Sequence, residues 1–171
     1  MNQFQQYAER ILIHGHIATD AVVSENFRKW SVVNIVFNYF QEDYRNLFTI
    51  VETDVPIEDI PTKTYPHIVV FGGLPKEGDS DTDHATTYCV VVDGIAFPKN
   101  PCIIEALKYL IVVYFNFNHT YENAFAHFLE FLQRCFMEIY PIDGNRSNVQ
   151  IIKKVQTFIK RIKAIEIQDI V

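Results

Sequence analysis

The pair Asp93-Gly94 constrains the fold more than any other feature, because it stands between two apolar runs, residues 88–92 and 95–97. An Asp-Gly pair in such a place is typical of a β-hairpin turn. An earlier β-branched run, residues 67–71, ends at a pair of glycines and favours a further strand. We therefore expect a small antiparallel β-meander of three strands in this part of the chain.

The segment before these strands has the apolar spacing of helices. Residues 2–13 carry apolar side chains at helical intervals, and Gly15 can end that helix. A second helix is predicted to begin near Ser24, although its β-branched residues weaken the pattern. Residues 47–52 fit either an extension of this helix or a strand. Three prolines then make residues 53–66 a surface loop.

The last third of the chain is helical by the same criterion. One helix is predicted to start at Pro101, and its apolar residues cover nearly the whole circumference. The next extends from Tyr121 to about Ile139 with Thr120 as its N-cap, and the last begins at Ser147. The predicted class is α+β, with an N-terminal helix pair, a small antiparallel β-meander and three C-terminal helices.

The length of 171 residues predicts one globular domain. Its three parts are helical residues 1–52, the loop and β-meander of residues 53–100, and helical residues 101–171. Apolar residues make up 49% of the chain and charged residues 21%, a balance that excludes a disordered or collagen-like protein.

Three cysteines, Cys89, Cys102 and Cys135, occur without a C-x-x-C pair, and the N-terminus lacks the pattern of a secretory signal. We therefore expect an intracellular protein, in the cytoplasm or the nucleus. The apolar stretch at residues 109–115 is far shorter than the roughly 20 residues that cross a bilayer. No membrane partner is expected.

Residues 66–140 contain, in this order, PHIVVFGG, YCVVVDGIAF and IIEALKYLIVVYFNFNHTYENAFAHFLEFLQRCFMEI. This order of strand, hairpin and two helices resembles a C-terminal module of uncharacterised multicopy animal proteins, some of them associated with mobile elements. The resemblance implies an accessory or interaction domain. It implies no established activity, no cofactor and no catalytic residues.

An acidic run is the most reactive-looking segment. Asp79, Asp81 and Asp83 follow positions 1, 3 and 5 of a calcium-binding loop, but His84 replaces the required Gly and Val90 the required Glu. A charged, solvated loop is therefore the favoured interpretation. Weak binding of a divalent cation stays open as the alternative, and we predict no metal site.

No arrangement typical of catalysis is found. Two glycines have the spacing of a phosphate loop, but Asp79 stands where Lys is needed. No G-x-S-x-G motif occurs. Cys135 could pair with His127 or His119 only through the fold, and its apolar neighbours favour a core position. We predict no catalytic residues and no cofactor.

Charge is distributed unevenly along a chain whose formal net charge is −6. Residues 52–83 contain eight acids against Lys63 and Lys76, whereas residues 146–163 contain six bases and no acid. A basic segment of this kind is typical of a solvated helix face, of an acidic protein partner or of nucleic-acid phosphate. The acidic loop of a second copy is a further possible partner.

These features favour a non-catalytic domain for protein–protein interaction or oligomerisation. Its predicted contact residues are Phe158, Ile159 and Ile162, through packing of a helix in a groove. Association with nucleic acid is the first alternative, through Lys153, Lys154, Lys160, Arg161 and Lys163. A hydrolase of unrecognised class is the second, built around Asp81, Asp83 and His84 or a Cys-His pair.

Overall fold

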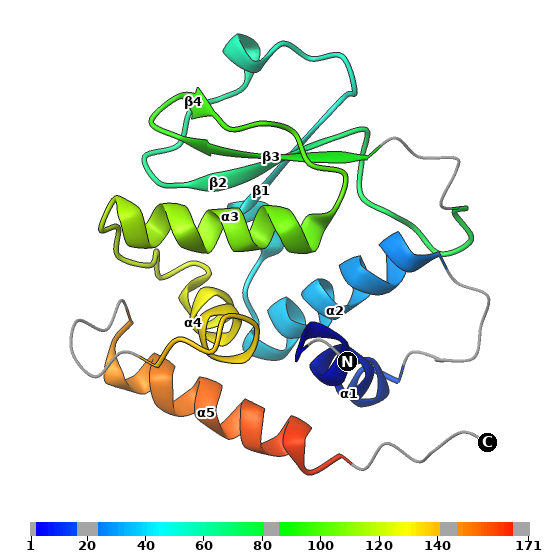
Figure 1. The fold of residues 1–171 in the computed structure, drawn as a ribbon, viewed down its shortest axis with the longest axis vertical. Helices are drawn as coiled ribbons and strands as arrows, with labels where there is room; N and C mark the ends of the chain where they lie inside the picture. The colour runs from blue at the N-terminus through cyan, green and yellow to red at the C-terminus, as the bar shows by residue number, and fades with distance from the viewer. Residues whose placement is uncertain (1–2, 17–23, 81–85, 141–146, 166–171) are drawn as a thin grey trace.

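The computed structural model describes residues 3–16, 24–80, 86–140 and 147–165. These residues form one four-stranded sheet and five α-helices. In Figure 1 the sheet is the upper layer, α3 (Ile103–Asn116) lies beneath it, and the other helices lie below α3. The mixed class of helices and sheet is thereby confirmed.

The strands follow chain order across the sheet as β1 (Phe48–Val51), β2 (His67–Phe71), β3 (Thr87–Val92) and β4 (Ile95–Ala96). Neighbours among β2, β3 and β4 are antiparallel, as in the predicted meander. β1 is parallel to β2. The sheet therefore has four strands and is mixed, which corrects the expectation of three antiparallel strands.

A long crossover makes the parallel pairing possible, because parallel neighbours cannot be joined by a tight turn. Residues 52–66 lead from the end of β1 back to the start of β2. Their prolines interrupt regular structure, and one short 3₁₀ turn forms among them, η2 (Ile57–Asp59). Ile60 of the crossover is buried with Val69 and Phe71 on the outer face of the sheet.

The hairpin between β3 and β4 turns at the predicted pair. Asp93 has φ 50° and Gly94 has φ 75°. Positive φ at both central residues is the geometry of a type I′ turn, whose twist matches that of the flanking strands. The turn pairs Val92 with Ile95 and so fixes the register of β4.

The inner face of the sheet belongs to the main core. Ile68, Val70 and Val90 are buried there, on the side covered by α3. α3 is buried over most of its circumference, as its apolar pattern predicts. An exposed stripe with Tyr109 and Val112 remains on its outer side.

The remaining helices are α1 (Gln3–His14), α2 (Glu25–Phe40), α4 (Ala126–Cys135) and α5 (Val149–Lys163). α1 packs against α2, and α5 packs against both α1 and α4. α4 is the central helix of this layer, because all but one of its ten residues are buried. Many of the aromatic side chains of the chain are buried in this core.

Of two predicted helix starts, that of α2 is confirmed and that of α5 is displaced by one residue. Ser24 is the N-cap of α2, and its Oγ accepts a hydrogen bond of 3.1 Å from the Phe27 amide, as expected. Asn148, not Ser147, is the N-cap of α5. Its Oδ1 accepts a hydrogen bond of 3.0 Å from the Ile151 amide.

The predicted start of α4 was wrong: Thr120 is not its N-cap, and the helix begins at Ala126. The capping group comes from the other half of the chain. The Glu42 carboxylate accepts hydrogen bonds from the His127 and Phe128 amides at 2.9 and 3.0 Å. A cap supplied by a residue so distant in sequence leaves no local signal.

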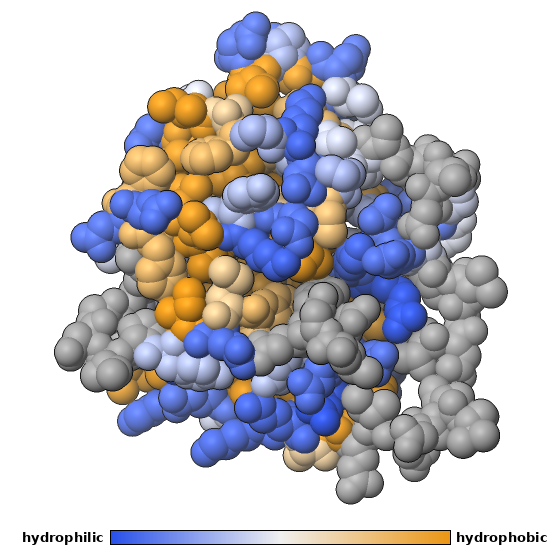
Figure 2. Space-filling view, in the orientation of Figure 1, coloured by the Kyte–Doolittle hydropathy of each residue, from blue (hydrophilic) through white to orange (hydrophobic). Residues whose placement is uncertain are grey.

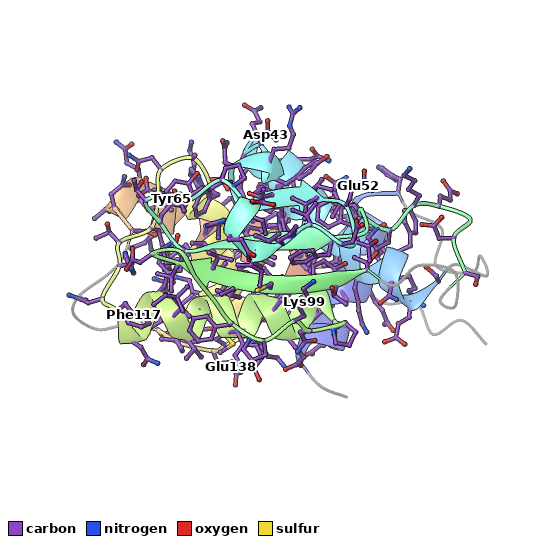
Figure 3. The ribbon with its side chains drawn as sticks, turned by 90° about the horizontal axis from the view of Figure 1, so that it is seen from above. Asp43, Glu52, Tyr65, Lys99, Phe117 and Glu138 are labelled. Atoms are coloured by element: carbon purple, nitrogen blue, oxygen red, sulfur yellow. The ribbon has the colours of Figure 1, made fainter. Side chains whose placement is uncertain are left out.

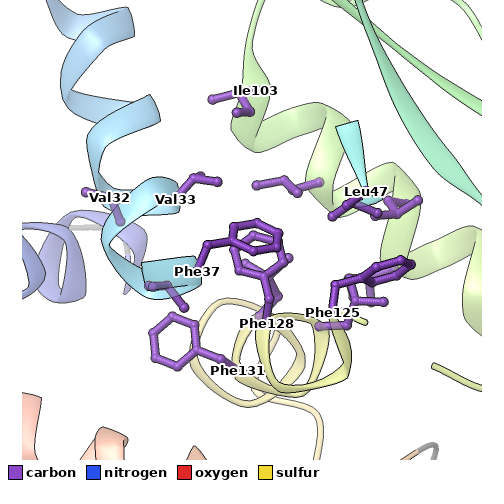
Figure 4. Packing of buried hydrophobic residues seen from close by; sticks show 14 of the residues in the cluster. Val32, Val33, Phe37, Leu47, Ile103, Phe125, Phe128 and Phe131 are labelled. Atoms are coloured by element: carbon purple, nitrogen blue, oxygen red, sulfur yellow. The ribbon is translucent and has the colours of Figure 1, made fainter. Parts of the chain in front are cut away.

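Aromatic rings join α2 to α4 at the centre of the core. The rings of Phe37 and Phe128 stack with their centroids 4.0 Å apart. Figure 4 shows Leu47, Phe125 and Phe131 around this stack. Stacked and edge-to-face pairs of this kind add to the free energy gained by burial alone.

Candidate anion-binding surface

The apolar face of α5 belongs to the core of its own chain. Phe158 and Ile162 are fully buried, and Ile159 is 9% exposed. The Phe158 ring stacks on that of Tyr39 at a centroid separation of 3.8 Å. These three side chains were the predicted contact residues, and the docked helix removes Phe158, Ile159 and Ile162 from any surface that a partner could reach.

The opposite face of α5 is basic and open to solvent. The exposed bases are Lys153, Lys154, Lys160, Arg161 and Lys163. Within the described residues none of these five cations takes part in an ion pair. Figure 2 shows hydrophilic side chains along the lower edge of the molecule, where α5 lies.

Helix geometry arranges these bases in two rows. Lys153 and Lys160 are seven residues apart, close to two turns, and so are Lys154 and Arg161. Two parallel rows of positive charge therefore run along the helix. The last turn also holds Lys160, Arg161 and Lys163, where cations are stabilised by the negative end of the helix dipole.

The acidic crossover lies at the other end of the molecule from these bases. Glu52, Asp54, Glu58 and Asp59 are exposed in the crossover. The crossover with η2 is at the top of Figure 1, and α5 is at the bottom. The two charged regions therefore do not neutralise each other within one chain.

A polar cleft of about 410 Å³ adjoins the basic face of α5. It lies between α1, α4, α5 and the segment after α4, and is lined by Gln6, Tyr7, Arg10, Arg134, Glu138, Tyr140 and Lys163. Lys163 belongs to both features, so the cleft and the basic face are continuous. Figure 3 places Glu138, at the cleft, on the opposite side of the molecule from Asp43.

Arg134 is the most deeply buried cation of the cleft, with 7% of the residue exposed. Its Nε donates a hydrogen bond of 2.5 Å to Glu130 Oε1, and Glu130 is itself fully buried. Tyr140 covers Arg134 from outside: the Tyr140 hydroxyl donates to the Arg134 carbonyl at 3.0 Å. The guanidinium carbon is 5.7 Å from the centre of the Tyr140 ring. These contacts fix the orientation of the guanidinium.

The other cations of the cleft come from α5 and α1. The Lys163 amine lies 5.9 Å from the centre of the Tyr7 ring, and its interaction with Tyr7 raises the pKa of Lys163. The Arg10 Nε atom is buried, and within the described residues it has no hydrogen-bond partner. A buried donor without a partner is unusual in a folded protein.

Most of the cleft could not be found from the sequence. Tyr7 and Arg10 lie at ordinary positions of an amphipathic helix and give no signal. α4 does give a signal in the sequence, because Glu130, Gln133 and Arg134 are polar residues on a helix that is otherwise apolar on nearly all sides. Buried polar residues of this kind must find partners.

Cys89 and Cys135 show no sign of activation. Burial raises the pKa of Cys135 to about 12 and also raises the pKa of Cys89. A thiol with such a pKa is protonated at neutral pH and is a poor nucleophile. His127, its suggested partner, instead places its Nδ1 2.9 Å from Glu42 Oε1.

The acidic run is described only at its start. The Asp79 carboxylate accepts a hydrogen bond of 2.6 Å from the Lys76 amide. Asp81, Asp83 and His84 lie outside the described residues. In the described part of the chain, no group of three His, Cys, Asp or Glu residues could hold a metal ion.

None of the helices in the described ranges is both long enough and apolar enough to cross a membrane. Comparison with models of protein families, with curated proteins and with solved structures found no match to this chain. The surface formed by α5 and the cleft is therefore interpreted from its own geometry and charge.

Proposed function

We propose that this chain is a non-catalytic protein–protein interaction domain that binds an acidic polypeptide through the basic face of α5. One observation carries the proposal: the core takes up the apolar side of α5, and the exposed side presents five cations without an ion pair among the described residues. Acidic side chains of a partner would complement such a face and accelerate association.

A protein partner fits this surface better than nucleic acid does. The chain as a whole carries a net charge of −6, which opposes a polyanion away from α5. Binding of single strands also uses exposed aromatic rings, on which bases stack. Two aromatic rings beside α5 already stack within the fold, Tyr39 on Phe158 and Phe40 on His127, and the exposed Tyr140 ring lies against the Arg134 guanidinium.

Binding of a labelled acidic peptide, followed by fluorescence anisotropy, tests the proposal. The test variant combines Lys153→Gln, Lys154→Gln and Lys160→Gln. Exposed ion pairs contribute about 0.2–1 kcal/mol each, so the loss of three should weaken binding by about 3-fold to 100-fold.

The control variant neutralises three exposed lysines elsewhere, Lys76, Lys99 and Lys108, with the same change in net charge. It should bind the peptide as the wild type does, within about 2-fold. Equal losses in the two variants would contradict the proposal, because only net charge would then matter. Tighter binding of an oligonucleotide than of the peptide would replace the protein partner with nucleic acid.

Light scattering after size exclusion tests whether the partner is a second copy of this chain. The acidic crossover of one molecule could bind α5 of the next, a head-to-tail contact that does not close on itself. Such association should be present at about 50 mM salt and lost at about 500 mM, where exposed charges are screened. A monomer at both salt concentrations would assign the basic face to a different protein.

A further inference from the structure

We propose that the cleft between α1, α4 and α5 binds a phosphate group on the acidic polypeptide that docks along α5. This inference rests on the proposed function, because it names the chemistry of the same partner. Binding of a phosphate group requires donors that converge on one point, positive charge that is not already compensated, and a position that a partner on α5 can reach.

The donors come from three helices and therefore approach the cleft from different directions. Arg10 lies on α1, Arg134 on α4 and Lys163 on α5. A phosphate monoester has three strong acceptor oxygens in a tetrahedral arrangement. Three cations around a cavity fit this geometry better than they fit a planar carboxylate, which a single guanidinium can bind with two parallel hydrogen bonds.

Two of these donors are available in the folded chain. Arg10 lines the cleft, and its guanidinium makes no hydrogen bond within the described residues. The terminal nitrogens of Arg134 make no hydrogen bond within the described residues, while its Nε is held by Glu130. Tyr7 also lines the cleft, and its hydroxyl group can donate a hydrogen bond to a ligand.

The charge at the cleft favours an anion. Three cations face it, and two carboxylates are close: Glu138 lines it, and Glu130 lies behind Arg134. Glu130 is fully buried, so it fixes Arg134 rather than contacting a ligand. Glu138 is exposed. The lysines and arginine of the adjoining α5 add further positive charge.

Lys163 connects the cleft to the docking face. It lies in the last turn of α5, next to Lys160 and Arg161 along the helix. A partner that follows the two rows of bases therefore reaches the cleft at one end of α5. A cavity of about 410 Å³ has room for a side chain that carries phosphate.

Two matched peptides test the inference: one acidic sequence with a single phosphoserine, and the same sequence with serine. Anisotropy titrations with the wild type should show tighter binding of the phosphopeptide by about 10-fold or more, because charge-assisted hydrogen bonds to Arg and Lys are added. Arg10→Gln should reduce this preference to below about 2-fold, while the serine peptide loses no more affinity than it does with the charge-matched variant Arg28→Gln. Arg28→Gln on α2 is the matched control and should keep the full preference.

Arg10→Gln is preferred to a change at Arg134, because Arg134 also stabilises the fold. Tyr7→Phe is the second variant and should weaken only the phosphopeptide. Equal affinity for the two peptides in the wild type would overturn the inference while the proposed function stands. A preference that survives Arg10→Gln would also overturn it, because the phosphate would then bind elsewhere.

A titration with inorganic phosphate distinguishes free phosphate from a phosphate group on a polypeptide as the ligand of the cleft. At constant ionic strength it should shift the amide resonances of Arg10 and Lys163, with wild type and not with Arg10→Gln. Binding of inorganic phosphate combined with no binding of either peptide would overturn both the polypeptide source and the proposed function. Binding of the serine peptide with no response to phosphate would overturn only the inference that the cleft binds a phosphate group.

Discussion

Replacement of Arg134 by methionine tests the interpretation of α4 as a central helix with an internal ion pair. Glu130 and Arg134 are four residues apart, and their side chains are 1% and 8% exposed. Methionine keeps an unbranched stem and removes the charge. Glu130 Oε1 then loses its partner, and Oε2 already has none among the described residues.

The expected loss is large because a buried carboxylate is left without compensation. Removal of one member of a buried pair costs about 3–5 kcal/mol. Since a typical domain is stable by only about 5–15 kcal/mol, much of the free energy of unfolding disappears. For a chain of this size each kcal/mol corresponds to about 2–4 °C, so the melting temperature should fall by about 6–20 °C.

Urea unfolding at neutral pH measures the effect, through a lower midpoint at an unchanged slope. The double variant Glu130→Leu with Arg134→Met should recover most of the loss, because apolar side chains of similar volume can replace a buried pair. Lys108→Met breaks the exposed pair with Glu105 and should cost less than about 1 kcal/mol. A loss below about 1 kcal/mol for Arg134→Met, or equal losses for the single and double variants, would refute the reasoning.

Three further predictions concern other buried groups. Burial lowers the pKa of His67 to about 4 from 6.5, so the unfolded chain takes up the proton first and stability should fall by up to about 3 kcal/mol as pH drops from 6.5 toward 4. Urea midpoints across this range should show it, and His67→Leu should flatten the slope. Glu42→Ala removes the cap of α4 and should cost about 1–2 kcal/mol in urea unfolding, whereas Glu52→Ala at an exposed site should change stability by less than about 0.5 kcal/mol. Phe158→Ala should cost about 3–5 kcal/mol in a thermal melt, and a change below about 1 kcal/mol would show that α5 is not docked.

Local patterns were sufficient where the structure depends on neighbours in sequence. Asp93 and Gly94 predicted the hairpin because positive φ at both positions is a local requirement. Ser24 predicted the start of α2 because its hydroxyl caps an amide three residues on. The apolar circumference of residues 103–116 likewise predicted a buried helix.

Distant contacts explain what the sequence left undecided. Within residues 47–52, Phe48–Val51 form a strand because β2 offers a parallel partner, and strand formation depends strongly on such a neighbour. Thr120 was expected to cap α4, but Glu42 supplies the capping carboxylate from the end of α2.

The basic face of α5 was foreseen from Lys153 and its neighbours, since a charged run needs no tertiary information. The sequence did not predict whether the apolar face of α5 packs in the core of its own chain or in a partner's groove, because the amphipathic spacing is the same in both cases. The cleft required Arg10 and Arg134 to meet from separate helices, and no local pattern encodes that meeting.

Chemical-shift mapping with an isotope-labelled chain and an acidic peptide at low salt is the most direct test of the proposed binding surface. We expect the amides of Lys153, Lys154 and Lys160 to shift, and these shifts to vanish as salt is raised. Shifts at the exposed stripe of α3, with Tyr109 and Val112, and none on α5 would contradict the account.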